Sequence, residues 1–394
     1  MSQVHVETYH ASLNKKYEEL CGDKVKVLRN DKSTTVVLSD GLGSGVKANV
    51  LATLTSEILA TMLNEGLDLT EAIETIINTL PVCNERKVAY STFTVCQVFY
   101  DGRVFMAEYD GPEAIVIRNG KELKIEKEVM IYQNKKVKTC SFICEPDDQV
   151  IFFSDGIVHA GIGTILNLGW DHEEIVQHIE SMYKPKDTAR DTCMNLLLAV
   201  DALYQGLPGD DSTVAVVKML PPKQSVVLVG PPESKEDDED VVMKLMRASG
   251  KKIVCGGSTS QMVARILNEE ITMPDLFSMI GGDIPPISYI NGIDLVTEGA
   301  LTLKKVLVFL TECNKSEEYL NHFMDGTEGD GAFRLAHMMI CDCTAIHFIQ
   351  GKADNIAHAS INYSPISLGR KMKTVERIGE ELKKLGKIVT FEQI

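Results

Sequence analysis

Hydrophobic and polar positions change their rhythm near the middle of the chain. Residues 212–219 (STVAVVKM) predict a strand, and residues 225–230 (SVVLVG) predict another. A Pro-Pro pair at 221–222 stands between them, and such a pair is typical of a linker. A length of 394 residues also exceeds what one ordinary core accommodates. We therefore predict one domain over residues 1–220 and another over residues 224–394.

The first part of the chain has the pattern of short strands interrupted by helices. Its strands are short apolar or alternating runs, whereas its helical segments repeat apolar residues at helical spacing. Asp-Gly and Asn-Gly pairs mark tight hairpin turns, because these residues accept positive φ. We predict a strand over 34–40, helices over 46–64 and 69–80 (the second with Thr70 as N-cap), an antiparallel meander over 91–125, a strand over 147–153, and helices over 171–183 and 187–204.

The second part alternates strands and helices. This alternation predicts a sheet of parallel character covered by helices on both sides, which is a three-layer α/β domain with Rossmann-like strand-helix order. The predicted elements are strands over 225–230 and 251–255, helices over 234–249 and 260–268, strand-like runs within 286–296, helices over 299–312 and 369–385, and a final strand over 387–391.

Composition narrows the range of partners. The formal net charge is −16, and an acidic surface repels the phosphates of nucleic acids. No apolar run approaches the roughly 20 residues of a transmembrane helix, and the start of the chain does not resemble a signal peptide. The ten cysteines include no CxxC pair, although the Cys341–Cys343 spacing (CDC) is unusual. We expect a cytoplasmic protein with free thiols and neither a nucleic-acid nor a membrane partner.

Aspartates stand beside glycines at the ends of predicted strands. An isolated Asp-Gly pair is ordinary turn chemistry, and we interpret Asp101-Gly102 and Asp110-Gly111 in that way. The run after strand 34–40 is stronger evidence, because its glycines let the backbone approach a ligand and leave a carbonyl free for a cation. A phosphate-binding loop would need a P-loop lysine or Rossmann glycine spacing, and the run has neither. The motifs are Gly22-Asp23, Asp40–Gly45 (DGLGSG), Ser154-Asp155-Gly156 and Gly209–Thr213 (GDDST).

Carboxylates gathered at one rim cannot all stay charged without compensation. A divalent cation would supply it, and an all-oxygen ligand set favours magnesium or manganese over zinc. Two such ions can lower the pKa of a shared water and stabilise the charge of a transferring phosphoryl group. The motifs therefore predict a metal centre suited to phosphoester hydrolysis.

The order of these motifs resembles the PPM (type 2C) metal-dependent protein phosphatases over about residues 15–219. The form is similar to the bacterial branch related to stage II sporulation protein E, which Lys47, Ala48 and residues 107–120 (AEYDGPEAIVIRNG) also fit. This resemblance implies an α-β-β-α sandwich, in which two antiparallel sheets are flanked by helices. It also implies hydrolysis of phosphoserine or phosphothreonine on a protein, such as an anti-sigma-factor antagonist. A homodimer is compatible with it.

The resemblance also implies roles for individual residues, with two Mn²⁺ or Mg²⁺ ions as cofactors. Asp40 would bridge both ions as a catalytic residue, and the Gly41 carbonyl would coordinate one of them. Asp155, the second catalytic residue, would hold the first ion together with Asp210, which the family pattern favours over Asp211. Asp23 would complete the shell of the second ion.

The chain departs from eukaryotic members of the family in its proton donor. Leu42 occupies the position where those members carry a histidine, so the acid for the leaving group is unassigned. Lys47 is a candidate for binding the substrate phosphate, and a solvated lysine in the first turn of a helix is the alternative. His159 follows Asp155 closely and could line the cleft, although a surface or packing role is more common for such a histidine.

A second candidate site lies in the C-terminal part. Gly256, Gly257, Ser258 and Thr259 join a predicted strand to a helix, and this junction can bind an anion through free amides. The alternative is an ordinary turn with Ser258 or Ser260 as N-cap. Gly230–Pro232, Asp294, Thr297 and Glu298 are candidates to face the same crevice. A phosphoprotein-binding module with little or no turnover, controlled by a ligand-sensing C-terminal domain, is the alternative function, and a C-terminal enzyme is a third.

Overall fold

The computed structural model describes residues 4–79, 91–132, 135–163, 165–273, 287–326, 330–353 and 366–394. The chain forms two compact units, Met1–Pro221 and Pro222–Ile394, so the division falls within the Pro-Pro pair.

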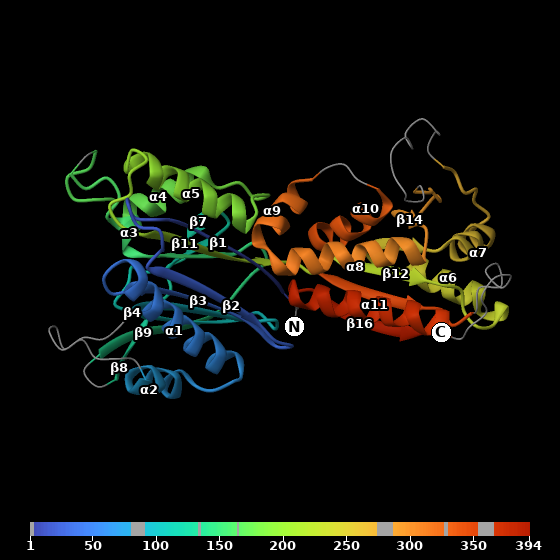
Figure 1. Ribbon diagram of the computed structural model, residues 1–394, viewed down its shortest axis with the longest axis horizontal. Helices are drawn as coiled ribbons and strands as arrows, with labels where there is room; N and C mark the ends of the chain where they lie inside the picture. The colour runs from blue at the N-terminus through green and yellow to red at the C-terminus, as the bar shows by residue number, and fades with distance from the viewer. Residues whose placement is uncertain are drawn as a thin grey trace. The chain divides into compact units, whose positions relative to one another are not determined.

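The N-terminal unit is a four-layer sandwich of two antiparallel sheets with helices on both outer faces (Figure 1). This architecture confirms the predicted fold. The first sheet has the order β1-β11-β10-β6-β7, formed by His5–Leu13, Ser212–Leu220, Gln149–Phe153, Ile115–Arg118 and Lys121–Glu122. The second has the order β2-β3-β4-β5-β9-β8, formed by Asp23–Arg29, Ser33–Gly41, Ser91–Phe99, Arg103–Tyr109, Lys135–Ile143 and Glu128–Tyr132.

Alternating side chains assemble the layers of this unit. Successive residues of a strand point to opposite faces of the sheet. In β3, Val36 and Leu38 belong to the core between the two sheets, whereas Val37 packs with the core under α1 and α2. In β10, Phe152 joins the core between the sheets and Phe153 joins the core under α4 and α5. Both strands are therefore buried on both faces.

The helices of the N-terminal unit follow the predicted pattern. The second sheet is covered by α1 (Gly45–Asn64) and α2 (Leu69–Thr79), and the first by α4 (His172–Met182) and α5 (Ala189–Leu203). Capping boxes at Asp171 and Thr188 begin the latter two. The predicted cap at Thr70 is wrong. The Asp68 carboxylate accepts a hydrogen bond from the amide of Glu71, whereas the Thr70 hydroxyl forms a hydrogen bond with the Tyr132 hydroxyl.

The predicted meander is correct only as far as Tyr109. Strands β4 and β5 form a hairpin in the second sheet, but β6 and β7 belong to the first sheet. The chain changes sheets after Asp110, which has φ of 54°. The Glu108 carboxylate accepts a hydrogen bond of 2.8 Å from the amide of Ala114 and so anchors the crossing segment.

Helix α1 is long and apolar enough to cross a membrane when only length and composition are considered. This corrects the expectation that no such run exists. Residues on one side of the helix, among them Leu51, Leu59 and Leu63, pack with the second sheet in the same core. A core helix can pass the same test, so the property is weak evidence for a membrane.

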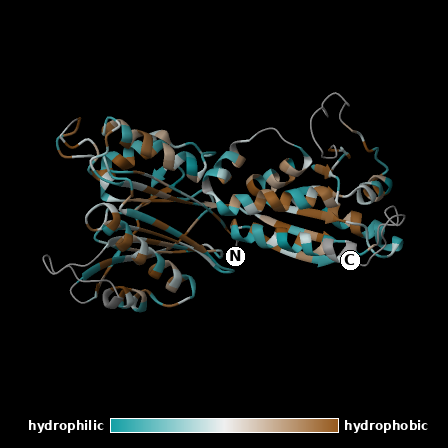
Figure 2. Ribbon diagram, viewed as in Figure 1, coloured by the Kyte–Doolittle hydropathy of each residue, from teal (hydrophilic) through white to brown (hydrophobic). Residues whose placement is uncertain are grey.

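The C-terminal unit is a parallel sheet between two layers of helices, which confirms the predicted three-layer domain. Its strands have the order β14-β13-β12-β15-β16, formed by Leu295–Thr297, Lys251–Cys255, Gln224–Val229, Ala345–Gln350 and Ile388–Gln393. One face packs against α6 (Asp238–Arg247) and α7 (Gly257–Leu267). The other packs against α8 (Ala300–Lys315), α10 (Gly331–His337) and α11 (Ile366–Lys384). The strands between these layers are coloured mainly as hydrophobic in Figure 2.

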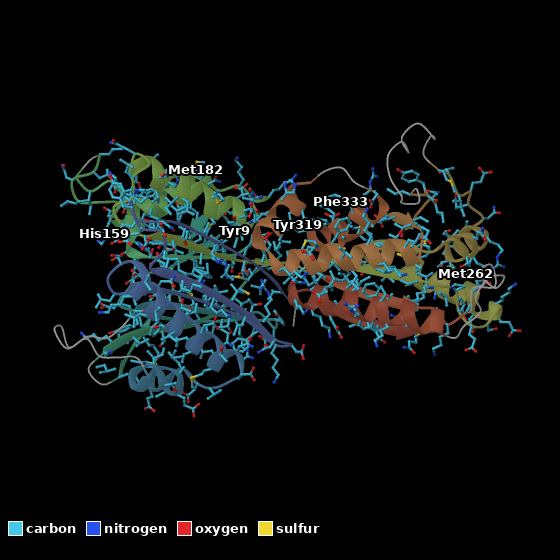
Figure 3. The ribbon with its side chains drawn as sticks, in the orientation of Figure 1. Tyr9, His159, Met182, Met262, Tyr319 and Phe333 are labelled. Atoms are coloured by element: carbon cyan, nitrogen blue, oxygen red, sulfur yellow. The ribbon has the colours of Figure 1, made fainter. Side chains whose placement is uncertain are left out.

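Four elements of the described residues in this unit were not predicted, namely α9 (Glu317–Asp325), α10, the π-helix η3 (Met338–Asp342) and β15. Helices α9 and α10 are short, and aromatic side chains pack between them. The ring of Phe333, labelled in Figure 3, lies 4.6 Å from that of Phe323. The strand-like runs within 286–296 yield only isolated bridges and the start of β14, and residue 286 lies outside the described residues. No disulfide joins the cysteines of the described residues.

Candidate metal centre

Asp23 and Asp40 face each other at one end of the second sheet. Asp23 begins β2, Asp40 is the next-to-last residue of β3, and the two are register partners. Gly41 lies where α1 approaches the strand, because a Cβ atom there would lie 2.0 Å from the carbonyl oxygen of Ala48. A glycine at this position therefore lets the first turns of α1 pack beside Asp40.

Asp155 and Asp210 reach the site from the first sheet. Asp155 begins α3 (Asp155–Val158) directly after β10, and Asp210 lies just before β11. Because β10 and β11 are antiparallel neighbours, the end of one strand meets the start of the other. Gly156 permits close contact between these segments, since a Cβ atom there would lie 2.0 Å from the carbonyl oxygen of Asp211. The Tyr204 hydroxyl donates a 2.7 Å hydrogen bond to the Gly156 carbonyl and holds the turn.

The neighbouring aspartates 210 and 211 have different environments. Asp211 is buried, and its two carboxylate oxygens accept hydrogen bonds of 2.9 and 2.8 Å from the amides of Lys15 and Gly22. Asp210 is partly exposed, and its Oδ1 lies 3.3 Å from the Lys15 ammonium. The structure thus leaves Asp210 accessible to a ligand and engages Asp211 with the backbone. Lys15 was missed because nothing near it in sequence marks a site.

The carboxylates of this cluster repel one another. Burial, followed by the charges of Asp23, Asp155 and Asp210, raises the pKa of Asp40 to about 9. Burial is also the main cause that raises the pKa of Asp23 to about 6 and that of Asp155 above its ordinary value. A cation bound among these groups would relieve the repulsion and favour their charged forms.

The donor set fits hard divalent cations. Asp23 is 5% exposed, and its buried Oδ2 has no hydrogen-bond partner among the described residues. A buried carboxylate oxygen without a donor is costly unless a cation or water satisfies it. With Asp40, Asp155 and Asp210 nearby, oxygen ligands of the kind that Mg²⁺ and Mn²⁺ prefer are available.

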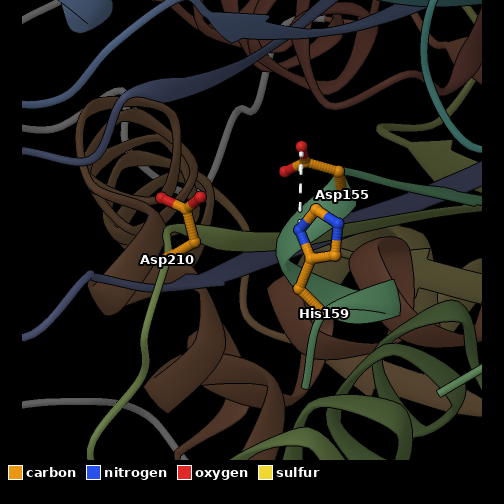
Figure 4. Close-up of side chains that lie close together, drawn as sticks. All are labelled: Asp155, His159 and Asp210. Atoms are coloured by element: carbon orange, nitrogen blue, oxygen red, sulfur yellow. Dashed lines mark ion pairs between the residues drawn. The ribbon is translucent and has the colours of Figure 1, made fainter. Parts of the chain in front are cut away.

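His159 also belongs to the cluster. One ring nitrogen of His159 and one carboxylate oxygen each of Asp155 and Asp210 lie within 4.8 Å of one another. The Nδ1 atom is 3.9 Å from Oδ2 of Asp155, and the dashed line in Figure 4 marks this pair. The structure thus places this histidine at the cleft rather than in a packing role.

Lys47 lies in the first turn of α1, and its side chain is exposed. No ion pair involves it within the described parts of the chain. Its role toward a substrate phosphate stays a prediction.

The predicted anion site of the C-terminal unit is only partly accessible. Gly256, with φ of 118°, precedes α7, and neither Ser258 nor Ser260 caps that helix with its side chain. Thr259 is buried, and its hydroxyl accepts a 3.0 Å hydrogen bond from the amide of Gly230. The threonine therefore ties two strand ends together. The accessible part of this junction is reduced to Gly256, Gly257 and Ser258.

Two other residues expected at this crevice are engaged elsewhere. The Asp294 carboxylate lies 3.0 Å from the Lys251 ammonium and accepts a hydrogen bond from the amide of Lys252. Both lysines lie at the amino end of β13. The crevice would lie at the carboxyl end, so this expectation is wrong. The Glu298 carboxylate accepts a hydrogen bond from the amide of Leu301 in the first turn of α8. Thr297 lies at the carboxyl end of β14, where its hydroxyl donates to the thiol of Cys255.

Comparison with known proteins bears on the N-terminal unit. The family model of stage II sporulation protein E (SpoIIE) matches residues 30–220, which confirms the resemblance found in the sequence. No curated protein matches the chain with significance.

Several solved structures are similar at low identity. The PP2C phosphatase domain with a fragment of the regulatory domain of SpoIIE from Bacillus subtilis is 21% identical over 56% of this chain and 64% of that chain, with a TM-score of 0.48. This chain therefore spans less than two thirds of that structure. The RsbU and RsbW domains of Rv1364c from Mycobacterium tuberculosis are 14% identical over 68% and 72% of the two chains, with a TM-score of 0.45. The catalytic domain of the phosphatase PstP, in complex with two manganese ions, is 14% identical over 55% and 99%, with a TM-score of 0.38.

Proposed function

Residues 30–220 of this chain belong to the stage II sporulation protein E family of PPM protein serine/threonine phosphatases, and from this we propose that the protein hydrolyses phosphoserine or phosphothreonine on a bacterial regulatory protein. The observation that carries the proposal is the meeting of Asp23, Asp40 and Asp155 with Asp210 at one rim of the sandwich, where burial and then the neighbouring carboxylate charges raise the pKa of Asp40. Such repulsion in a folded protein is typical of a site that binds cations.

In this proposal the four aspartates hold two divalent ions, Mn²⁺ or Mg²⁺. Asp40 and the Gly41 carbonyl would help to hold both ions, Asp155 and Asp210 would hold one of them, and Asp23 would hold the other. When bound, the ions supply an activated water and neutralise phosphoryl charge. The chain itself orients these ligands, because β2 and β3 fix Asp23 against Asp40, and Gly156 fixes Asp155 near Asp210.

Two lysines are candidates for binding the substrate phosphate. Lys47 is the one expected from the sequence, and its exposed position on α1 leaves it free to reach a ligand. Lys15 is the second, because its ammonium already lies 3.3 Å from Asp210. Following the resemblance, an anti-sigma-factor antagonist is the proposed substrate protein. A cytoplasmic location and a homodimer remain proposals of the same kind.

The direct test is hydrolysis of p-nitrophenyl phosphate and of a phosphoserine peptide by the full chain. Activity should require Mn²⁺ or Mg²⁺ and disappear with EDTA. Asp40→Asn should lower kcat by about 100-fold or more, since it removes the bridging charge. Asp101→Asn is the matched control, because Asp101 lies in a surface turn beside Arg103. A fully metal-loaded protein that is inactive on both substrates would refute the proposal.

The alternative is a phosphoprotein-binding module with weak or no turnover, regulated by a ligand of the C-terminal unit. Lys371 of α11 supports a ligand there. Its ammonium lies beside Gly230 at the carboxyl end of β12, where a Cβ atom added to the glycine would be only 2.5 Å from Nζ of Lys371. Burial lowers the pKa of this lysine. The carboxyl ends of parallel strands are where α/β sheets bind ligands. Thermal-shift titrations with nucleotides and phosphorylated metabolites, repeated on Lys371→Met, test this role. A shift that survives the substitution would contradict this location.

A further inference from the structure

The turn that carries Asp155 also presents a nitrogen ligand to the cleft. α3 is a single turn, and the amide of His159 donates a 2.9 Å hydrogen bond to the Asp155 carbonyl. Residues four apart in such a turn lie on the same face. Ile157 and Ala160 are fully buried on the opposite side, so the core fixes the orientation of the turn. Asp155 and His159 are thereby directed to solvent, each about half exposed.

The same turn also brings a third candidate ligand, Asp210, close to His159. Gly156 packs against the backbone of Asp211, which brings Asp210 within reach of Asp155 and His159. Among the described residues, the carboxylates of Asp155 and Asp210 are neighbours of the His159 ring, and the 3.9 Å between its Nδ1 and Oδ2 of Asp155 is longer than a hydrogen bond. A ring nitrogen of the neutral imidazole is therefore available to coordinate a cation. His159 is labelled in the N-terminal unit in Figure 3, and the close-up in Figure 4 shows both carboxylates near its ring.

Charge favours a neutral ligand at this place. Asp23 and Asp40 are register partners on neighbouring strands, so two carboxylates already oppose each other here. A further carboxylate would add to that repulsion, whereas an imidazole adds a donor atom without adding charge. The buried, unpartnered Oδ2 of Asp23 is independent evidence that the cluster accommodates a cation.

We propose that His159 is a metal ligand, and that Asp155, His159 and Asp210 together bind one ion with a preference for Mn²⁺ over Mg²⁺. Imidazole suits first-row transition metals, whereas Mg²⁺ demands oxygen ligands and retains its waters. This inference rests on the proposed metal-dependent function and specifies the metal selectivity of its site.

Mn²⁺ and Mg²⁺ binding to the full chain, measured by calorimetry, tests the preference without any activity assay. His159→Ala should weaken Mn²⁺ binding at this ion by about tenfold or more and change Mg²⁺ binding less than about twofold. His159→Asp should tighten Mg²⁺ binding relative to Mn²⁺. His172→Ala is the matched control, because that partly exposed histidine neighbours Glu122 instead. An unchanged ratio of the two affinities in His159→Ala would overturn the proposal.

Pulsed electron paramagnetic resonance of bound Mn²⁺ gives a second readout. Nitrogen modulation from coordinated imidazole should be present in the wild type and in His172→Ala, and absent in His159→Ala. Nitrogen modulation that persists in His159→Ala would refute the assignment. A protein that shows the modulation yet hydrolyses no phosphoester would refute the phosphatase function and leave the ligand assignment intact. An active enzyme that shows no nitrogen modulation would support the phosphatase function and refute the assignment of His159 as a metal ligand.

Discussion

Asp23 and Asp40 are register partners on the antiparallel strands β2 and β3, and both lie at the same end of the second sheet. Directly opposed like charges destabilise a sheet unless something compensates them. Here the opposition is reinforced by Asp155 and Asp210 from the other sheet. The protein therefore maintains an unfavourable charge cluster at a fixed position, which is the arrangement expected of a cation site.

The first prediction separates two adjacent aspartates. Asp210→Asn should weaken metal binding by about tenfold or more while changing the free energy of unfolding by less than about 0.5 kcal/mol, because its side chain is partly exposed. Asp211→Asn should instead cost about 1–3 kcal/mol, because it loses an acceptor for a buried amide. Denaturant unfolding with EDTA and metal calorimetry measure both. If Asp211→Asn weakened metal binding and Asp210→Asn mainly lowered the free energy of unfolding, Asp211 would be the metal ligand.

The second prediction concerns the contact that positions Asp155. Gly156→Ala should cost about 1–3 kcal/mol and reduce metal affinity, because the new Cβ would lie 2.0 Å from the Asp211 carbonyl oxygen. Gly209→Ala is the control, because Gly209 lies in the neighbouring loop before β11. Its Cβ would lie 3.4 Å from the ring of Tyr204, so we expect less than about 0.5 kcal/mol. If the two substitutions changed the free energy of unfolding and the calorimetric metal affinity equally, this account would be contradicted.

The third prediction is a pH dependence that metal reverses. The folded-state pKa values of about 9 for Asp40 and about 6 for Asp23 lie above those of unfolded aspartate. With EDTA, the folded protein binds more protons than the unfolded one between about pH 4 and pH 9, so these groups lower the free energy of unfolding as pH rises. Mn²⁺ displaces the protons, so the stabilisation it confers should grow with pH.

Unfolding curves at several pH values, with EDTA and with excess Mn²⁺, measure this effect. Asp40→Asn should flatten the dependence seen with EDTA, because the aspartate whose pKa is raised most no longer titrates. Stabilisation by Mn²⁺ that is the same at every pH would show that the aspartates do not release protons on binding.

The fourth prediction tests the role of Thr259 in the C-terminal unit. Thr259→Val should cost about 1–3 kcal/mol, because the buried amide of Gly230 loses its acceptor, whereas Thr259→Ser should retain most of the stability. Unfolding by denaturant distinguishes the two. If Thr259→Val kept full stability but abolished ligand-induced thermal shifts, the threonine would be a ligand contact after all.

Local patterns were sufficient for most of the fold. The continuous apolar run of β3 and the apolar spacing of α1 are properties of short segments, so the sequence alone predicted both elements. The switch of sheets after Tyr109 was missed, because the pairing of β6 with β10 joins residues far apart in the chain. The short helices α9 and α10 were missed for a related reason, since aromatic packing between Phe323 and Phe333 supports them more than local propensity does.

The sequence by itself determined which aspartates to consider, because each stands beside glycine at the end of a strand, and this is a local signal. Only the tertiary structure decided their environments. Asp211 is engaged by amides from the segment after β1, and His159 is turned toward Asp210 by a contact between two loops. Those relationships depend on how strands from distant parts of the chain meet at one rim, and no spacing within the sequence encodes them.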